Sequence, residues 1–429
     1  MMNNVLKEKY INKAKDIFRK NTFEGYSSFK KTRFKFIAPA SVEYTFQWLW
    51  DSSFHAIVLS NFDLEWAKAE IKNHLKAQWN NGFIPHIIFW GGKYLDLPHW
   101  AFIESKISLR PRTSAITQPP VLALAIEEIF KKDGDEQSSL SDKEFIKEVL
   151  PKIAKFHRWL IENRDLDGDS LVSIISPNES GMDELPVFQA ALNYFKENAA
   201  ILHYTHRKVD LLNQFYGFNS KKILDKDYFN VSELLFNCVF IEANRSLGRL
   251  FKEISEISES EFFLDLAEKS EKSLLEKCWN KEDKIFYSLY SKGQNQAKVK
   301  TVASLMPLFL DGLKGEKLEA LIAHLENRDE FWRPYPIPSV SADERYYEPG
   351  DTPLYKVKLL WRGPTWINTN WFIVKGLRKH GYDNLADQIV EKMIEMIEKS
   401  GFREYYNPET GEGYRRENFG WSTLILDLL

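Results

Sequence analysis

The sequence predicts an all-α protein folded as an (α/α)6 toroid. Apolar residues recur at i, i+3 and i+4 over most of the chain, which is the spacing that places them on one face of a helix. Between the helical segments lie long loops rich in Gly, Pro, Asn and aromatic residues, and loops of this length in a compact protein are usually functional. Helix pairs that alternate with such loops predict two concentric rings of antiparallel helices, with the loops crowded on one face.

The helical periodicity defines the expected elements in chain order. We expect helices over residues 3–20, 52–77, 114–132, 142–164, 184–197, 199–215, 231–251, 259–279, 299–313, 315–326, 365–379, 383–400 and 419–429. The long decorated loops are expected at 80–100, 163–186, 333–353 and 401–420.

The domain organisation follows from length and from the lack of any linker. The chain has 429 residues, of which 44% are hydrophobic, and neither a short repeat nor a low-complexity segment divides it. We therefore expect one domain over residues 1–429. Residues 187–230 interrupt the regular rhythm, and they are open to two interpretations: an insertion that caps the mouth of a cavity, or an ordinary helix pair with a long connection.

The charge balance argues against polyanionic partners. The formal net charge is −3, from 58 Lys+Arg and 61 Asp+Glu, so no strong field attracts nucleic acid or an acidic membrane. A small molecule of low charge is the better fit. The N-terminus has charges every few residues instead of the apolar core of a signal peptide, and no window approaches a membrane span, so we expect a cytoplasmic protein. The sequence gives no indication of the oligomeric state.

No metal or cofactor is expected. Cys238 and Cys278 lie in apolar helical stretches without metal-ligand spacing, which is typical of buried thiols. The nine histidines show no zinc pattern. The stretch DLDGDS (165–170) resembles the start of a calcium loop, but the Glu that an EF-hand needs at position 176 is Ser, which favours a tight polar turn. Whether this turn binds calcium is left open by the sequence.

Aromatic residues are unusually frequent. The chain contains 13 Trp, 18 Tyr and 30 Phe. Flat apolar side chains can stack on the C–H faces of sugar rings as well as fill a core. Their clustering in the loops indicates a carbohydrate site more strongly than their number does.

Cleavage of a glycosidic bond needs one carboxylic acid to protonate the departing oxygen and a second carboxylate to activate water or attack the sugar. Most acids here lie on solvated helix faces, so the candidates are loop acids among aromatic and small residues. Asp183 stands in SPNESGMDELP, where it either acts chemically or caps the following helix, and Glu179 is its neighbouring competitor. Glu404 is surrounded by aromatic residues in FREYYNPETGEG, whereas Glu409 and Glu412 look like solvated turn residues.

Five separated motifs carry a resemblance to a known family. They are QWLWDSSFHA (47–56), RTSAITQPP (112–120), DLDGDSLVSIISPNESGMDELP (165–186), WRGPTWINTNW (361–371) and FREYYNPETGEGYRRENFGWS (402–422). Together they make the chain resemble the bacterial members of glycoside hydrolase family 63, in a clan shared with the trehalases. The resemblance implies an inverting α-glycoside hydrolase with Asp183 as general acid and Glu404 as general base. Inversion in turn implies carboxyl groups roughly 6.5 to 9.5 Å apart, with room for a water.

The same motifs supply candidate substrate contacts. The tryptophans can stack on sugar, Asp51 can accept two hydroxyls, Gln118 before two prolines can present its amide in a set direction, and Arg362 supplies a fixed fork of donors. His86 is the histidine best placed to face a cavity, and Arg207 in the possible cap is expected to meet a carboxylate on the aglycone, the part that leaves the sugar. The predicted substrate contacts are Tyr44, Trp48, Trp50, Asp51, His86, Gln118, Trp361, Arg362, Gly363, Trp366, Trp421 and Arg207.

The aglycone is the least determined part of the prediction. Larger family members carry an N-terminal β-sandwich, which we do not expect here because the QWLWD motif already begins at residue 47. The compact architecture resembles that of the hydrolases of mannosylglycerate and glucosylglycerate. Leu360 departs from the aromatic residue expected before WRGP in those relatives. An α-glucosidase of neutral di- or oligosaccharides is the main alternative. A sugar epimerase or lyase, which would need His or Tyr bases, and a non-catalytic carbohydrate-binding toroid are less favoured.

Overall fold

The computed structural model describes residues 2–91, 97–132, 140–195, 198–351 and 359–429. Residues 92–96 of the predicted loop 80–100 and residues 352–353 of the predicted loop 333–353 lie outside them. Residues 196–197, which belong both to the predicted helix 184–197 and to the segment 187–230, lie outside them as well. The helices are α1 (Met2–Lys20), α2 (Leu49–Leu59), α3 (Leu64–Leu75), α4 (His99–Ile103), α5 (Leu122–Lys132), α6 (Leu140–Arg164), α7 (Phe188–Ala191), α8 (Ala199–Phe215), α9 (Ser220–Lys226), α10 (Leu234–Glu253), α11 (Ile257–Lys277), α12 (Val302–Leu305), α13 (Glu316–Glu326), α14 (Ile367–Lys379) and α15 (Asp383–Ser400). The 3₁₀ helices in the described residues are η2 (Pro177–Ser180), η3 (Met306–Phe309) and η4 (Gly420–Asp427).

Strands are short and scattered. They are β1 (Thr22–Ser27), β2 (Thr32–Ile37), β3 (Gln47–Trp48), β4 (Ile87–Ile88), β5 (Val231–Ser232), β6 (Trp279–Asn280), β7 (Ile285–Phe286), β8 (Leu289–Tyr290), β9 (Asn295–Gln296), β10 (Arg403–Tyr406) and β11 (Gly413–Glu417). All pairings among them are antiparallel, in the order β1-β2, β3-β4, β5-β8-β9, β6-β7 and β10-β11. These small sheets stiffen loops and build no layer of their own.

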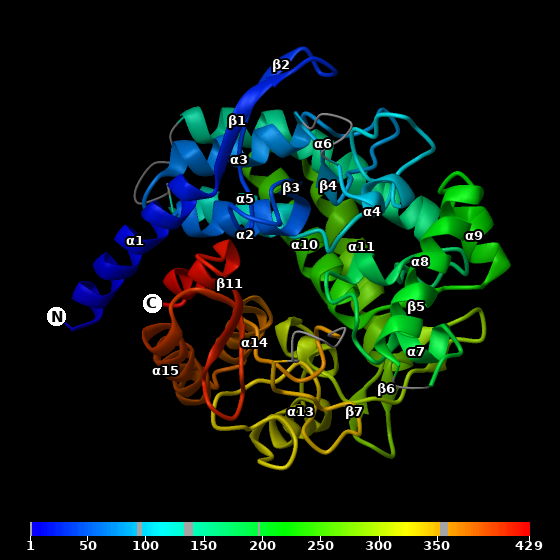
Figure 1. Ribbon diagram of the computed structural model, residues 1–429, viewed down its shortest axis with the longest axis vertical. Coiled ribbons are helices and arrows are strands. Elements are labelled where there is room, and N and C mark those ends of the chain that lie inside the picture. The colour runs from blue at the N-terminus through cyan, green and yellow to red at the C-terminus, as the bar shows by residue number, and fades with distance from the viewer. Residues whose placement is uncertain (1, 92–96, 133–139, 196–197, 352–358) are drawn as a thin grey trace.

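The helices close into a double ring. In the inner ring α2 contacts α5, α5 contacts α10, α10 contacts η3, η3 contacts α14, α14 contacts η4, and η4 returns to α2. In the outer ring α3, α6, α11 and α15 each pack against the inner helix that precedes or neighbours them, and α1 packs against η4. The N-terminal helix therefore lies beside the C-terminal segment (Figure 1). This arrangement confirms the predicted toroid.

Burial explains which helices are inner. Every residue of α2 is buried, and α10 is buried on nearly all sides, as expected of helices enclosed by others. The outer helix α15 instead buries a stripe at helical spacing: Leu385, Ala386, Ile389, Val390, Met393, Met396 and Ile397. Helices that are apolar on nearly all sides thus lie in the inner ring, and helices with a single apolar stripe lie in the outer ring.

The predicted helix 52–77 is wrong as a single element. It is divided into α2 and α3, because the chain turns after Leu59 and Asp63 caps a new helix by accepting the backbone N–H of Trp66 at 3.0 Å. The periodicity continues across the break because both helices bury apolar faces.

Other boundaries also need correction. In the predicted helix 114–132, the residues before Leu122 form no helix, because Pro119 and Pro120 disfavour it and the backbone near Ile116 bonds to the segment around β4. Within the described part of 184–197, α7 is the helix that forms, after Pro186. The predicted helix 299–313 is α12 followed by η3, and 419–429 is the 3₁₀ helix η4. Short helices α4 and α9 and the hairpin β1-β2 were not predicted.

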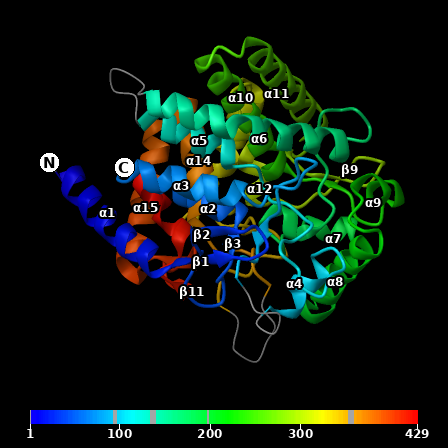
Figure 2. The same ribbon diagram turned by 90° about the horizontal axis from the view of Figure 1, so that it is seen from above.

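The loops gather on one face, as expected. In Figure 2, α4, α7, α8, β1, β2 and β11 lie on one side of the rings, opposite α6, α10 and α11. The segment 187–230 contains α7, α8 and α9, with α8 against α4 and α9 against α6. No helix in the described part of the chain combines the length and the apolarity needed to cross a membrane.

Candidate active site

Two adjoining hollows on the loop face make up the inner and outer halves of the candidate site. They share Tyr44, Trp48, Gln118 and Asp183 as lining residues. The inner half has a volume of about 80 Å³ and contains Glu404, and the outer half has a volume of about 280 Å³. Asp183 therefore stands where the two halves meet.

Aromatic rings wall the inner half. Trp361 and Trp366 stack with ring centroids 3.7 Å apart and planes within 8°. Trp421 packs edge-on to Trp50 at 5.7 Å, and Phe419 completes the wall. Trp361 has φ of 59°, an uncommon backbone conformation for a bulky residue, and such strain often occurs at functional sites. The inner half is thus a rigid apolar slot of the kind that binds a sugar ring.

Buried polar atoms in this slot lack protein partners. Within the described residues, Asp51 Oδ1, Glu404 Oε2, Trp48 Nε1 and Trp366 Nε1 are buried without a hydrogen-bond partner. Leaving buried polar groups unpaired is costly, so their concentration in one hollow indicates a polyhydroxylated ligand. Acceptors and donors are both present, which matches sugar hydroxyl groups.

Glu404 is aimed into the cavity by an irregular strand. In β10 the register against β11 shifts between Arg403 and Tyr405, which places Glu404 at the irregularity. Tyr44 donates a hydrogen bond to Glu404 Oε1 at 3.0 Å. Burial raises the pKa of Glu404 to about 7, against the lowering effects of Arg415 and the Tyr44 hydrogen bond. A carboxylate held by one oxygen, with the other free, can orient and deprotonate a water.

Asp183 lies in a turn and caps no helix, which removes the capping alternative: the next helix, α7, begins at Phe188 with Val187 at its N-cap. Burial raises the pKa of Asp183 to about 7. Gly181 allows the turn, because it has φ of +71° and a Cβ there would lie 2.5 Å from the ring of Trp50. An acid that keeps its proton near neutral pH is suited to protonate a leaving group.

Glu179, the competitor of Asp183, has another role. Both of its oxygens bind Arg164 at 2.7 Å, and it accepts backbone N–H groups of Ile175 and Thr117 at 2.8 and 3.1 Å. It is fully buried and does not line the cavity. This ion pair anchors the loop that carries Asp183.

The outer half is rich in residues that the sequence did not reveal. Besides the shared residues it is lined by Glu43, His86, Trp100, Ile103, Glu104, Asn178, Glu184, His203, His206, Arg207 and Asp210. Most of the cluster comes from α4, α8 and the loop around Asp183, and Glu43 and His86 come from the segments before β3 and β4. Of these residues, only His86 and Arg207 were predicted. The others lie on α4 and α8 or beside the motifs, where no sequence pattern marked them.

Most predicted contacts meet at the cavity. Tyr44, Trp48, Trp50, Asp51, His86, Gln118, Trp361, Trp366, Trp421 and Arg207 line one or both halves. The side-chain oxygen of Gln118 accepts the backbone N–H of Trp50 at 3.3 Å, which orients this amide at the cavity wall. Arg362 and Gly363 differ: neither lines the cavity. Arg362 is buried near the ring of Tyr346, and Gly363 donates to Ser339 Oγ at 2.9 Å, so both support the wall from behind.

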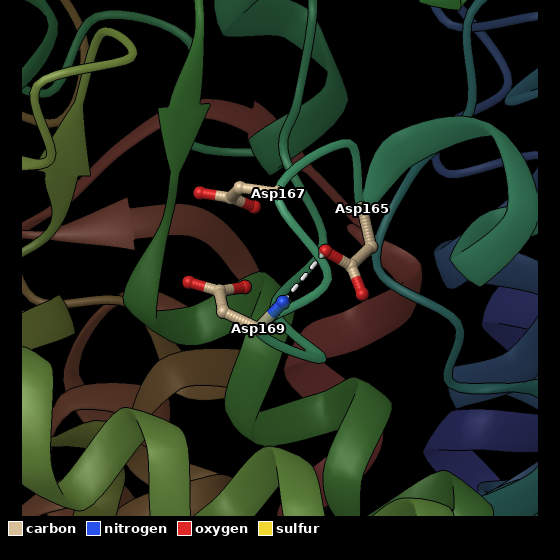
Figure 3. A group of neighbouring side chains, drawn as sticks. All are labelled: Asp165, Asp167 and Asp169. Atoms are coloured by element: carbon tan, nitrogen blue, oxygen red, sulfur yellow. Dashed lines mark hydrogen bonds between the residues drawn. The ribbon is translucent and has the colours of Figure 1, made fainter.

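The Asp165, Asp167 and Asp169 side chains do converge, with carboxylate oxygens within 4.8 Å of one another (Figure 3). Asp165 accepts three backbone N–H groups, from Gly168, Asp169 and Ser170. Asp169 also binds Lys277 at 2.7 Å. These contacts are those of the expected tight polar turn, with a lysine beside it.

Comparisons with known proteins agree with this geometry. A family model described as the mannosylglycerate hydrolase MGH1-like glycoside hydrolase domain matches residues 44–422. The mannosylglycerate hydrolase of Thermus thermophilus is 31% identical over 417 residues, covering 92% of this chain and 97% of that protein. The glucosylglycerate hydrolase of Mycolicibacterium hassiacum is 26% identical, covering 91% of this chain and 93% of that protein. A crystal structure of the GH63 mannosylglycerate hydrolase from Thermus thermophilus in complex with Tris and D-glycerate superposes with a TM-score of 0.84 at 28% identity, covering 98% of this chain and 100% of that one.

Proposed function

This chain belongs to the MGH1-like glycoside hydrolases of family 63, and from that premise we propose that it hydrolyses small α-glycosides of glycerate with inversion at the anomeric carbon. In this proposal Asp183 is the general acid and Glu404 the general base. The inner half binds the sugar and the outer half binds the aglycone.

One observation carries the assignment of roles. Asp183 is shared by both halves, whereas Glu404 lines only the inner half. A general acid must reach the oxygen that joins sugar to aglycone, and a general base must reach a water on the opposite side of the sugar ring. The positions of the two carboxyl groups match these two tasks, and their raised pKa values suit proton transfer near neutral pH.

The remaining residues of the inner half hold the sugar. Trp361 and Trp366 offer a stacked face to the C–H side of the ring. Asp51 Oδ1 is available as an acceptor for a sugar hydroxyl, and Trp48 Nε1 as a donor. Closing the slot with a sugar would satisfy these atoms and exclude bulk water, leaving room for the one water that Glu404 activates.

Arg207 supports a carboxylate on the aglycone. Arg207 lies on α8 and lines the outer half. Among the described residues that line this half, it is the one arginine. A carboxylate in this partly enclosed space needs a charged or multiple-donor partner. The relatives named above act, by their names, on mannosylglycerate and glucosylglycerate. In this role α8 forms part of a cap over the cavity mouth.

A neutral sugar aglycone is the second candidate. The volume of about 280 Å³ in the outer half exceeds the needs of a three-carbon acid, and several carboxyl groups there can accept hydroxyl groups. Such a substrate would make the enzyme an α-glucosidase of disaccharides.

A hydrolysis screen separates the candidates. Purified protein is incubated with glucosylglycerate, mannosylglycerate, trehalose, kojibiose and nigerose, and kcat/KM is measured for each. The highest kcat/KM on a glycerate glycoside is expected. A clear preference for a neutral disaccharide would overturn the glycerate assignment in favour of the second candidate.

A further inference from the structure

Two buried carboxyl groups in the outer half have no part in the mechanism above. Glu104, at the end of α4, and Asp210, on α8, are 7% and 3% exposed. The side-chain amide of Asn178 joins them: its Nδ2 lies 2.8 Å from Glu104 Oε1 and 3.4 Å from Asp210 Oδ2. Two such groups so close together rarely both carry a charge.

The hydrogen bonds around Asp210 favour its ionised form. Asp210 Oδ1 accepts the hydroxyl of Ser176 at 2.6 Å, and Oδ2 accepts from Asn178. Hydrogen bonds donated to a carboxylate stabilise its charge. Burial raises the pKa of Asp210 to about 7, and the Ser176 hydrogen bond opposes this rise, so Asp210 is the member of the pair that loses its proton more readily.

The surroundings of Glu104 differ because of His86. Ser114 Oγ lies 2.7 Å from His86 Nδ1, 3.2 Å from the backbone N–H of Ile87 and 3.2 Å from the carbonyl oxygen of Ile116. A serine hydroxyl has one proton. All three contacts are hydrogen bonds only if Ser114 donates to Ile116 and accepts from both Ile87 and His86 Nδ1.

This assignment leaves the other nitrogen of His86 as an acceptor. His86 Nε2 lies 3.5 Å from Glu104 Oε2. Burial lowers the pKa of His86 to about 3, so the imidazole is neutral. A lone pair of Nε2 then faces Glu104, and the contact is favourable when Glu104 carries the proton.

The neighbouring charges act in the same direction. Burial, followed by the charges of Asp210 and Asp183, raises the pKa of Glu104 well above its usual value, and Arg207 opposes this. Glu179, Asp183 and Arg207 act on the pair directly, and the charge of Asp210 contributes to the raised pKa of Tyr228. The other titratable groups nearby are Glu43, Glu184, His203 and His206, which line the same half of the cavity, and His74, which lies near His86. Arginine is the one permanent cation among them.

We propose that Glu104 is a neutral carboxylic acid, hydrogen-bonded by Asn178 and facing the lone pair of His86 Nε2, and that it determines specificity by letting an acid-rich cavity accept an anionic aglycone. This inference rests on the proposed glycerate substrate. An ionised Glu104 beside Asp210 would repel a carboxylate held by Arg207, whereas the neutral acid keeps the hydrogen-bonding capacity of the cavity without a second negative charge.

Kinetics across pH test the proposal with two substrates. In the wild type, the ratio of KM for the glycerate glycoside to KM for an aryl α-glycoside of the same sugar is expected to rise with pH as Glu104 ionises, by up to about tenfold per pH unit. Glu104→Gln, which mimics the protonated acid, should keep the wild-type ratio at pH 6 and abolish the rise. Asp210→Asn is the matched control: it should retain the rise but move it to lower pH, because removing its charge lowers the pKa of Glu104.

Infrared spectroscopy provides a readout that does not depend on turnover. The difference spectrum between wild type and Glu104→Gln at neutral pH should contain the C=O stretch of a protonated carboxylic acid, shifted in D₂O. Absence of this band, or an increase of about tenfold in the KM ratio for Glu104→Gln at pH 6, would overturn the proposal. If the wild type hydrolyses no glycerate glycoside, the proposed aglycone is wrong, and the infrared band alone decides whether Glu104 is neutral.

Discussion

The hydroxyl of Tyr44 donates a hydrogen bond to Glu404 Oε1 at 3.0 Å and leaves Oε2 without a protein partner. The two oxygens of the proposed base are thus different: one is held by the protein and the other is directed to the cavity. The hydrogen bond also lowers the pKa of Glu404 against the effect of burial. Tyr44 therefore both orients the carboxylate of Glu404 and lowers its pKa.

Tyr44→Phe should weaken catalysis and shift its pH dependence. Loss of the hydrogen bond raises the pKa of Glu404, and because the base must be ionised, the acidic limb of kcat/KM moves to higher pH. A hydrogen bond to a charged group contributes about 1.5–3 kcal/mol, so a fall of roughly 10- to 100-fold is expected at pH 6. A pH–rate profile measures both the fall in kcat/KM and the shift of its acidic limb. Tyr216→Phe is the control, because Tyr216 lies outside the cavity lining. A loss of activity that is equal at every pH would leave Tyr44 with a packing role alone.

Asp183→Asn and Glu404→Gln should each lower kcat by at least ~10²-fold, because each removes a group that transfers a proton. Circular dichroism should show an unchanged fold. Glu412→Gln is the matched control, because Glu412 is exposed in the turn that follows the strand of Glu404, and this variant should retain wild-type turnover. An aryl glycoside with an acidic leaving group should rescue Asp183→Asn more than Glu404→Gln. Unchanged turnover in either variant would contradict its assignment.

The stereochemistry of the product tests the role of Glu404 directly. If Glu404 activates water, the first sugar released from an α-linked substrate should be the β-anomer. Proton NMR of the reaction in its first minutes distinguishes the anomers before they interconvert. Initial release of the α-anomer would mean retention and would make Glu404 a nucleophile.

Gly181→Ala should damage the site through two effects. The residue has φ of +71°, and the new Cβ would lie 2.5 Å from the ring of Trp50, so the loop before Asp183 must shift. Gly168→Ala is the matched control, because Gly168 has φ of +72° and nothing within 4 Å of its Cβ position. We expect both variants to lose about 1 kcal/mol of unfolding free energy for the backbone conformation, and Gly181→Ala to lose more, along with most of its kcat/KM. Thermal denaturation and kinetics measure the two effects. Equal behaviour of the two variants would mean that Trp50 can move aside.

Arg207→Ala should raise KM for glucosylglycerate or mannosylglycerate by about 10-fold or more and leave KM for an aryl glycoside nearly unchanged. A charge-assisted hydrogen bond to a carboxylate accounts for this difference. Lys208→Ala removes an adjacent exposed cation that does not line the cavity, so it controls for general electrostatics. Similar effects of Arg207→Ala on both substrates would remove Arg207 from the aglycone contacts.

The sequence predicted best where a pattern is local. The helices 199–215 and 383–400 were predicted with their observed bounds, because propensity and apolar periodicity act over neighbouring residues. The sequence predicted helix boundaries less well where a distant partner or a single capping residue determines them. Asp63 is an example, because its cap divides one periodic stretch into two helices. The strands were missed because they are pairs of short loop segments, some of which bond across long separations in the chain.

By itself, the sequence determined the toroid and the motif residues, because the periodicity specifies helices with buried faces and the motifs place acids among aromatic loops. Only the tertiary structure decided how the acids divide their roles. Glu179 and Asp183 lie four positions apart, yet one is neutralised by Arg164 and the other opens to the cavity. Glu104 and Asp210 carry no motif and meet through Asn178 only in the fold. The physical reason is that the role of a carboxyl group depends on its burial and on the donors and charges around it, and these come from segments far apart in the chain.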